Sequence, residues 1–126
     1  MKVRKFDHMA DYETLCMWWK QHEWLPVPVQ CLPMTGFIVD GLAAGFLYKT
    51  DSNIAWLEWV VANKESDKEE RSKAIDLVVD ELILRAKELG YTRIFTSTNN
   101  PKLEERYHKH GFGSFDKNVT QMIWGT

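Results

Sequence analysis

Residues 91–113, YTRIFTSTNNPKLEERYHKHGFG, decide the fold that this sequence predicts. The run 91–98 is rich in β-branched and aromatic residues and predicts a strand. Asn100 is a favoured N-cap residue, and Pro101 stands at the first helical position, where its missing N–H costs nothing. Gly111 is placed to end the helix in the left-handed conformation. The stretch therefore predicts a strand followed by a short helix, as in an α/β protein.

Tyr107 lies on the last turn of this expected helix. Leu103, Tyr107 and His110 share one face of the helix, whereas charged pairs at i,i+4 spacing occupy the other. Because the helix follows the strand directly, Tyr107 is expected near the C-terminal end of that strand. Ligands of open α/β sheets bind along this edge. Tyr107 is therefore a candidate functional residue, and a tyrosine that only packs against the core is the alternative.

The composition narrows the class of protein. A chain of 126 residues can form one domain with a substantial core, and its net charge of -2 gives no basic footprint for nucleic acid. Cys16 and Cys31 lack metal-ligand or redox spacing, which predicts reduced thiols in a cytoplasmic protein. Neither a membrane-spanning run nor a signal peptide in residues 1–15 is expected. The four histidines form no helical ligand pair, so no metal site is predicted.

The whole sequence predicts a single domain, residues 1–126. Asp11 can cap the first helix, and the box Ser66-x-x-Glu69 can open a long helix that ends at Gly90. The elements expected before and after residues 91–113 are a strand (2–6), a helix (11–23), a proline-rich loop (24–33), a hairpin (35–40 and 42–48), a strand (54–62), the long helix (66–89) and two short strands (114–116 and 119–124). The residues expected in the core are Trp19, Phe37, Phe46, Leu57, Val78, Val79, Leu82, Ile94 and Phe112.

This order of elements resembles the GNAT (GCN5-related) N-acetyltransferase family. Members often read N-x-x-A-x-x-L-Y-x-K-x-G-F after the strand, and Leu103 and Arg106 replace the usual Ala and Leu here. The chain keeps the other quoted positions: Asn100, Tyr107, Lys109, Gly111 and Phe112. The resemblance implies a single-domain α/β (α+β) fold with a mixed, mostly antiparallel sheet. That sheet should splay between its fourth and fifth strands and carry helices on both faces.

The resemblance also implies a reaction, in which an amine attacks the thioester of acetyl-CoA directly. Tyr107 stands at the family position of the acid that protonates the leaving thiolate. Glu58 stands where members often supply the base, although exposed strand glutamates are common. The backbone of Val60, Val61 and Ala62 corresponds to the segment that pairs with the pantetheine arm of acetyl-CoA. These residues would bind the thioester end of the cosubstrate.

The loop that should hold the diphosphate departs from the family pattern. Members carry R/Q-x-x-G-x-G/A there, whose glycines bring backbone N–H groups to the phosphates at a helix N-terminus. Residues 63–76, NKESDKEERSKAID, contain no glycine. Two registers align this segment with the family pattern. The first keeps Arg71 but aligns Asp76 with the last position of the pattern, where the family has glycine or alanine; the second, shifted by one residue, leaves Arg71 out of the pattern. Alternatively, the segment is a solvated, charged first turn of the helix. The residues assigned to the cofactor by the resemblance are Arg71, Ser72, Lys73, Ala74, Ile75 and Asn100.

Two functions stay open at this point. The first is N-acetyl transfer from acetyl-CoA to a primary amine. The second is a non-catalytic, GNAT-like protein with a degenerate CoA loop, which uses an aromatic surface to bind a host or virion protein. The six tryptophans are compatible with a core, a pocket wall or an interface. The motif order also resembles small GNAT-like proteins of tailed phages, and relatives of this kind often form homodimers.

Overall fold

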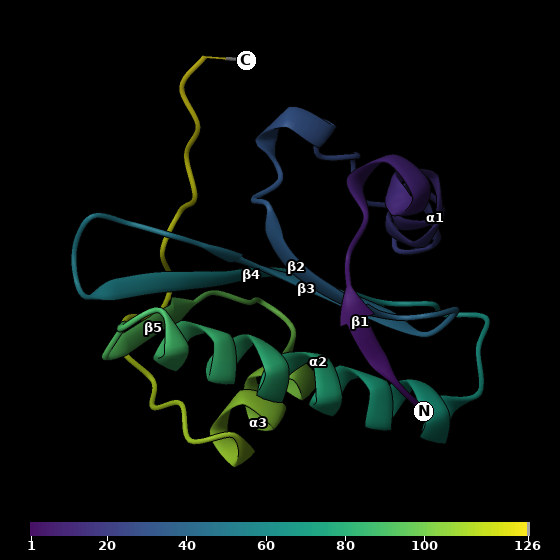
Figure 1. The fold of residues 1–126 in the computed structure, drawn as a ribbon. Helices are drawn as coiled ribbons and strands as arrows, with labels where there is room; N and C mark the ends of the chain where they lie inside the picture. The colour runs from purple at the N-terminus through teal and green to yellow at the C-terminus, as the bar shows by residue number, and fades with distance from the viewer. Residues whose placement is uncertain (126) are drawn as a thin grey trace.

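The computed structural model describes residues 1–125 as one mixed sheet between two layers of helices (Figure 1). Strands β1 to β4 are antiparallel neighbours in the order of the sequence, and β5 pairs with β4 in parallel. Helix α1 covers one face, and α2 and α3 cover the other. The elements are β1 (Val3–Lys5), α1 (His8–Gln21), a 3-10 turn (Val29–Cys31), β2 (Thr35–Val39), β3 (Ala43–Tyr48), β4 (Ile54–Ala62), α2 (Lys68–Glu88), β5 (Arg93–Thr96) and α3 (Pro101–Lys109).

This architecture confirms the predicted α/β fold with helices on both faces. The strand–helix unit of β5 and α3 forms as the sequence indicates, and Asn100 caps α3 through its side-chain oxygen. Gly41 takes a positive φ of 73° in the hairpin between β2 and β3. Within residues 1–125, no helix combines the length and the apolar character needed to cross a bilayer.

The sheet separates two hydrophobic layers. The larger lies between the sheet and α2, where Leu82 is fully buried, and the smaller lies under α1 around Trp18 and Trp19. Seven of the nine residues expected in the core are buried. The other two, Ile94 and Phe112, are partly buried against the larger layer. The apolar periodicity therefore identified the core correctly.

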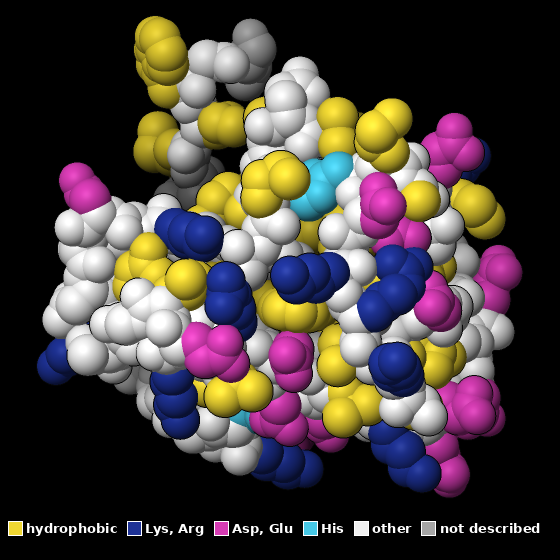
Figure 2. All heavy atoms as spheres, viewed as in Figure 1, with side chains coloured by type: hydrophobic (Ala, Val, Ile, Leu, Met, Phe, Trp, Pro, Cys, Tyr) yellow, Lys and Arg dark blue, Asp and Glu magenta, His cyan; other side chains and the backbone are white. Residues whose placement is uncertain are grey.

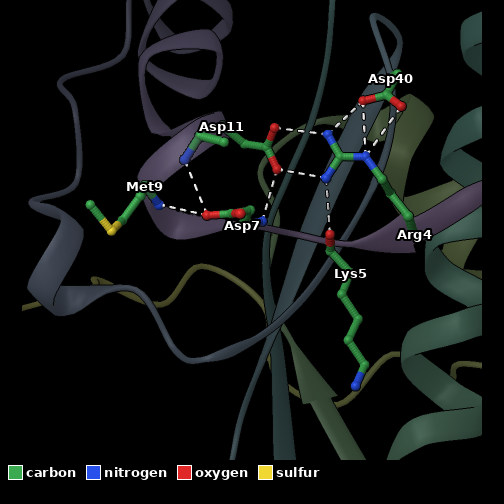
Figure 3. Close-up of polar contacts among 7 residues, drawn as sticks. Arg4, Lys5, Asp7, Met9, Asp11 and Asp40 are labelled. Atoms are coloured by element: carbon green, nitrogen blue, oxygen red, sulfur yellow. Dashed lines mark hydrogen bonds and ion pairs between the residues drawn. The ribbon is translucent and has the colours of Figure 1, made fainter.

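The predicted start of the first helix was wrong. Helix α1 begins at His8, and its N-cap is Asp7, whose side chain accepts hydrogen bonds from the backbone of Met9 and Ala10. Both aspartates can cap a helix, but Asp11 is only 7% exposed and is engaged elsewhere. Its two carboxylate oxygens accept hydrogen bonds from Arg4, each at 2.8 Å (Figure 3). Asp11 is thus paired with Arg4 of β1 and lies in the first turn of α1, not at its N-cap.

The Arg4–Asp11 pair fastens β1 to α1, and its loss should destabilise the fold. Arg4→Met should lower the free energy of unfolding by about 2–4 kcal/mol, because it leaves the buried Asp11 carboxylate without its cation. Asp40→Asn is the matched control; Asp40 also contacts Arg4, but it is exposed, so the effect should stay below about 1 kcal/mol. Urea denaturation at pH 7 measures both.

The same pair has a defined pH dependence. The hydrogen bonds from Arg4 lower the pKa of Asp11 below its usual 3.8, against the opposing effect of burial. The stabilisation is therefore fully present above pH 3.8 and is lost as pH falls through the lowered pKa of the folded state. The difference in the free energy of unfolding between wild type and Arg4→Met should therefore shrink as the pH falls below 3.8. A difference that is already absent at pH 7 would contradict this role for the pair.

The two short strands predicted after α3 were also wrong. Residues 113–125 contain neither helix nor strand, although the positive φ of 57° at Asn118 fits the turn expected between them. A strand is stabilised by its neighbours in a ladder, so strand propensity alone is not sufficient. In this structure the segment runs past β5 and away from the sheet (Figure 1).

Candidate active site

The candidate site lies where β4 and β5 separate. Their parallel pairing ends at Leu57 and Thr96, whereas β4 continues against β3 to Ala62. A β-bulge follows directly, because Trp59 and its successor together oppose the single residue Gly45. Trp59 has a positive φ of 60°, which is unusual for a bulky residue and is found at bulges that redirect a strand. The bulge therefore coincides with the predicted splay of the sheet.

Glu58 immediately precedes this bulge. Its carboxylate accepts a hydrogen bond of 3.0 Å from the hydroxyl of Ser97, the first residue after β5. Burial raises the pKa of Glu58 above its usual 4.5, and the hydrogen bonds from Ser97 oppose part of that rise. A carboxylate with a raised pKa is a better proton acceptor near neutral pH. Glu58 is thus placed and tuned as a base could be.

Tyr107 reaches the same region from α3. Its side chain is buried, with 4% exposed, and its ring lies 5.3 Å from that of Phe112. Burial raises the pKa of Tyr107 to about 12, the nearby Thr96 opposes the rise, and the charge of Glu58 adds to it. The phenol is therefore protonated at neutral pH. The structure brings Glu58 near enough to Tyr107 for the carboxylate charge to raise the pKa of the phenol, although the two residues are far apart in the sequence.

The predicted phosphate loop is largely helical in the structure. Helix α2 begins at Lys68, and Asp67 caps it by accepting a hydrogen bond from the backbone of Glu70. Ser72, Lys73, Ala74 and Ile75 therefore lie inside α2, where helical hydrogen bonds occupy the backbone N–H groups. The N-cap is Asp67 rather than the predicted Ser66. An uninterrupted helix replaces the loop because residues 63–76 contain no glycine and Asp67 is a strong cap.

The short segment before α2 is held by its own hydrogen bonds. Backbone N–H groups of this segment bind side chains and carbonyls, and the guanidinium of Arg71 donates to the carbonyl of Ser66 at 2.6 Å. The backbone donors and their acceptors are Lys64 to Gln21, Glu65 to Asn63 and Ser66 to Asn63. The segment therefore offers few free N–H groups to a diphosphate. Most of the backbone N–H groups in this segment are therefore not available to cradle phosphates, and the side chains of Lys64 and Lys68 are the candidate contacts.

The other residues assigned to the cofactor are placed as follows. Asn100 uses its side-chain oxygen to cap α3, through bonds to the backbone of Lys102 and Leu103. The side chains of Val60 and Val61 are buried on opposite faces of the sheet. The carbonyl of Ala62 lies 3.0 Å from His22 Nε2. A role for these residues in cofactor binding stays a prediction.

A polar cluster joins α2 to α3 beside the site. Arg106 donates to Asp76 at 2.7 Å and to the carbonyl and hydroxyl of Ser72. The two ring nitrogens of His110 lie 2.8 and 2.9 Å from Asp80 and Asp76. Burial alone would raise the pKa of Asp76, but the hydrogen bonds from His110 and Arg106 outweigh that effect and lower the pKa below its usual 3.8. The cluster fixes α3, and with it Tyr107, relative to α2.

Sequence reasoning missed most of this cluster and missed Ser97. Arg106 entered only as a departure from the family motif, and Ser97 was one polar residue in a strand. The i,i+4 spacing of Asp76 and Asp80 on α2 was a usable signal, since it places two carboxylates on one helix face. A histidine or arginine on a helix that packs against that face is then an expected partner.

Comparisons with known proteins agree on the fold. No protein-family model and no curated protein matches the sequence. A Mycobacterium tuberculosis protein, solved in complex with CoA and NLQ, is 17% identical, with 95% of this chain and 76% of the other covered at a TM-score of 0.76. Glucosamine-6-phosphate N-acetyltransferase from Arabidopsis thaliana is 12% identical, with 97% of each chain covered at 0.70.

One similar structure has a different description. A transcriptional regulator from Bacillus halodurans is 14% identical, with 97% of this chain and 99% of the other covered at a TM-score of 0.70. At such identities the likeness concerns the arrangement of the backbone and not the reaction. The five-stranded mixed sheet with its three helices matches the fold of the neighbours. The chain therefore has the GNAT fold.

Proposed function

We propose that the protein transfers an acetyl group from acetyl-CoA to a primary amine, by direct attack of the amine on the thioester. One observation supports the proposal: at the separation of β4 and β5, Glu58 lies near enough to Tyr107 for its charge to act on the phenol, and burial raises the pKa of both groups. A proton acceptor and a protonated phenol at one opening are the two groups that aminolysis of a thioester needs. The CoA-bound neighbour with the same fold supports the choice of acyl donor.

The proposed roles follow from the protonation states. The carboxylate of Glu58 accepts a proton from the ammonium, directly or through water, and the free amine attacks the thioester carbon. The carbon–sulfur bond then breaks, and Tyr107 donates its phenolic proton to the leaving thiolate. The attacking nitrogen still carries one extra proton, which it gives to the Tyr107 phenolate, so the products are the neutral amide and the CoA thiol, and Glu58 releases its proton to solvent. Ser97 holds Glu58 in place through its hydroxyl. Thr96, which donates to the carbonyl of Leu57 at 2.7 Å, keeps the two strands together just before the opening.

A second function is favoured by a different observation. The segment before α2 uses its backbone donors internally, and Asp67 places a carboxylate at the helix N-terminus, where a diphosphate would have to bind. A GNAT-like protein that has lost CoA binding would show this arrangement. Such a protein would act through a surface that binds another protein, and a phage origin, suggested by the resemblance, would suit that role.

Calorimetric titration with acetyl-CoA and with CoA separates the two functions. The enzyme should bind acetyl-CoA with a dissociation constant below ~100 μM, equivalent to about 5.5 kcal/mol. Thermal stability should rise in parallel as the cosubstrate is added. No heat of binding, together with an unchanged melting temperature at millimolar acetyl-CoA, would exclude the proposed transferase and favour the protein-binding function.

Variants at the start of α2 test how the diphosphate is held. Lys68→Ala should weaken CoA binding by about 1–3 kcal/mol, the contribution of a charge-assisted contact, and the loss should shrink at high salt. Asp67→Ser keeps a capping oxygen but removes a negative charge, so it should strengthen binding. Lys87→Ala, at the other end of α2, is the control and should change nothing. Equal affinities for all three variants would show that CoA does not contact this helix end.

A further inference from the structure

Aromatic side chains flank Glu58 on the side of the sheet that α1 covers. Side chains alternate along a strand, and Leu57 is buried under α2, so Trp56 and Glu58 point to the α1 side. Tyr48 is the partner of Trp56 on β3, and Phe95 is its partner on β5, with the ring centroids of Trp56 and Phe95 5.1 Å apart. Trp56 remains 38% exposed. With the neighbouring Trp59 these rings form the aromatic surface, which consists of Tyr48, Trp56, Trp59 and Phe95.

Trp59 is held in a fixed position on this surface. Its indole N–H donates to the hydroxyl of Tyr48 at 2.9 Å, and that hydroxyl donates to the carbonyl of Cys31 at 2.7 Å. Its ring lies 6.5 Å from that of Trp19, which is buried under α1. The residue nevertheless stays 37% exposed. A positive φ at a bulky residue is strained, and such strain persists mainly at functional sites. The ring is therefore positioned in advance for contact with a ligand.

Glu58 is a partly buried carboxylate without a cation. Within residues 1–125 it forms no ion pair, and its side chain accepts a hydrogen bond from the hydroxyl of Ser97. Burial raises the pKa of Tyr48, and the charge of Glu58 adds to that rise, so the carboxylate lies close to the aromatic surface. A carboxylate withdrawn from water is costly unless a cation pairs with it. The surface thus offers one negative charge beside several aromatic rings.

We propose that the acceptor is a primary amine with a single positive charge, attached to an aromatic or other flat apolar group. The ammonium group pairs with Glu58, and the apolar group packs against Trp56 and Trp59, whose faces also attract cations. A polyamine would leave at least one ammonium group without a carboxylate. An amino sugar would place hydroxyl groups against rings that cannot hydrogen-bond them. This inference rests on the proposed transfer reaction, because the bound amine is the acceptor in that reaction.

Calorimetric titration with amines tests the substrate class. Phenethylamine should bind at least ~10-fold tighter than butylamine or putrescine, because only its ring packs on the aromatic surface. Phenethyl alcohol has the same ring without the charge, so it should bind ~10-fold weaker than phenethylamine, and Glu58→Gln should remove that difference. The titrations are made with and without CoA and need no turnover. A failure of amine binding is therefore distinguished from a failure of acetyl transfer.

Variants at Trp56 separate the aromatic face from the volume of the side chain. Trp56→Leu should weaken the binding of phenethylamine about 5–30-fold. Trp56→Phe keeps an aromatic face and should lose less than about 3-fold. Trp124→Leu is the control and should change nothing, because Trp124 is 96% exposed. Figure 2 shows hydrophobic side chains at the C-terminal end of the chain projecting from the body of the protein. Far-ultraviolet circular dichroism checks that each variant is folded.

Nuclear magnetic resonance of the indole N–H groups locates the bound amine. Phenethylamine should shift the indole resonances of Trp56 and Trp59, whereas that of Trp18, buried under α1, should stay in place. Equal affinities for phenethylamine and putrescine would overturn the proposed substrate class. So would an absence of binding by all of these amines, both with and without CoA. An unchanged affinity in folded Trp56→Leu would also overturn it, since the amine would then bind elsewhere.

Discussion

Glu58→Gln should lower kcat for acetyl transfer by about 10²–10⁴-fold, the usual contribution of one positioned proton-transfer group. Glutamine can still accept a hydrogen bond from Ser97 through its side-chain oxygen, so the local structure should be retained. The affinity for acetyl-CoA should change little, because the carboxylate acts on the amine and not on the donor. Steady-state kinetics with a reactive amine, together with calorimetric binding of acetyl-CoA, measures the two effects separately.

The pH profile gives this prediction a second readout. Burial raises the pKa of Glu58 above 4.5, and the protonated form cannot accept a proton. In wild type, kcat/KM should therefore fall as pH decreases through that raised pKa. The acceptor amine titrates as well, so the limb that belongs to Glu58 is the one that Glu58→Gln removes. Glu13→Gln, at an exposed position on α1, is the control. Turnover of Glu58→Gln equal to that of wild type would remove Glu58 from the mechanism.

Local signals in the sequence were sufficient for most of the fold. The Asn100 cap, the apolar stripe of α2 and the Gly41 hairpin each act over a few residues, and each formed as expected. The start of α1 was missed because Asp7 and Asp11 are equally good caps locally. Only the contact with Arg4, on another element, selects between them. The strands expected after α3 do not form in the structure, for the same kind of reason. Strand-forming residues alone do not specify the neighbouring strand with which they would have to pair.

The same contrast between local signals and contacts from distant elements applies to the candidate site. The positions of Glu58 and Tyr107 could be inferred because a strand and a helix with clear boundaries carry them. The pKa shifts of the two residues could not be inferred, since they depend on Ser97, on Thr96 and on how deeply each group is buried in the folded chain. The helical conformation at Ser72 was ambiguous in the sequence, where a cofactor loop and a capped helix were both open. Asp67, which caps the helix, settled that choice in the structure.

Tyr107→Phe should lower kcat by about 10²–10⁴-fold with little change in the affinity for acetyl-CoA. The aromatic ring and its contact with Phe112 are retained, so the free energy of unfolding should move by no more than about 1 kcal/mol. With a pKa of about 12, the phenol stays protonated across the working range. Tyr107 should therefore contribute no alkaline limb to the activity of wild type below about pH 11.

The choice of leaving group sharpens this test. A phenol with a raised pKa is a weak acid, so its proton matters most when the leaving thiolate is strongly basic. An acetyl thioester with a more acidic thiol, such as an aryl thiol, needs less protonation, and Tyr107→Phe should lose much less activity with it. His108→Gln, on the exposed side of α3, is the control for changes in that helix. Equal losses with both thioesters, together with a lower melting temperature, would mean that the hydroxyl of Tyr107 supports the fold and not the reaction.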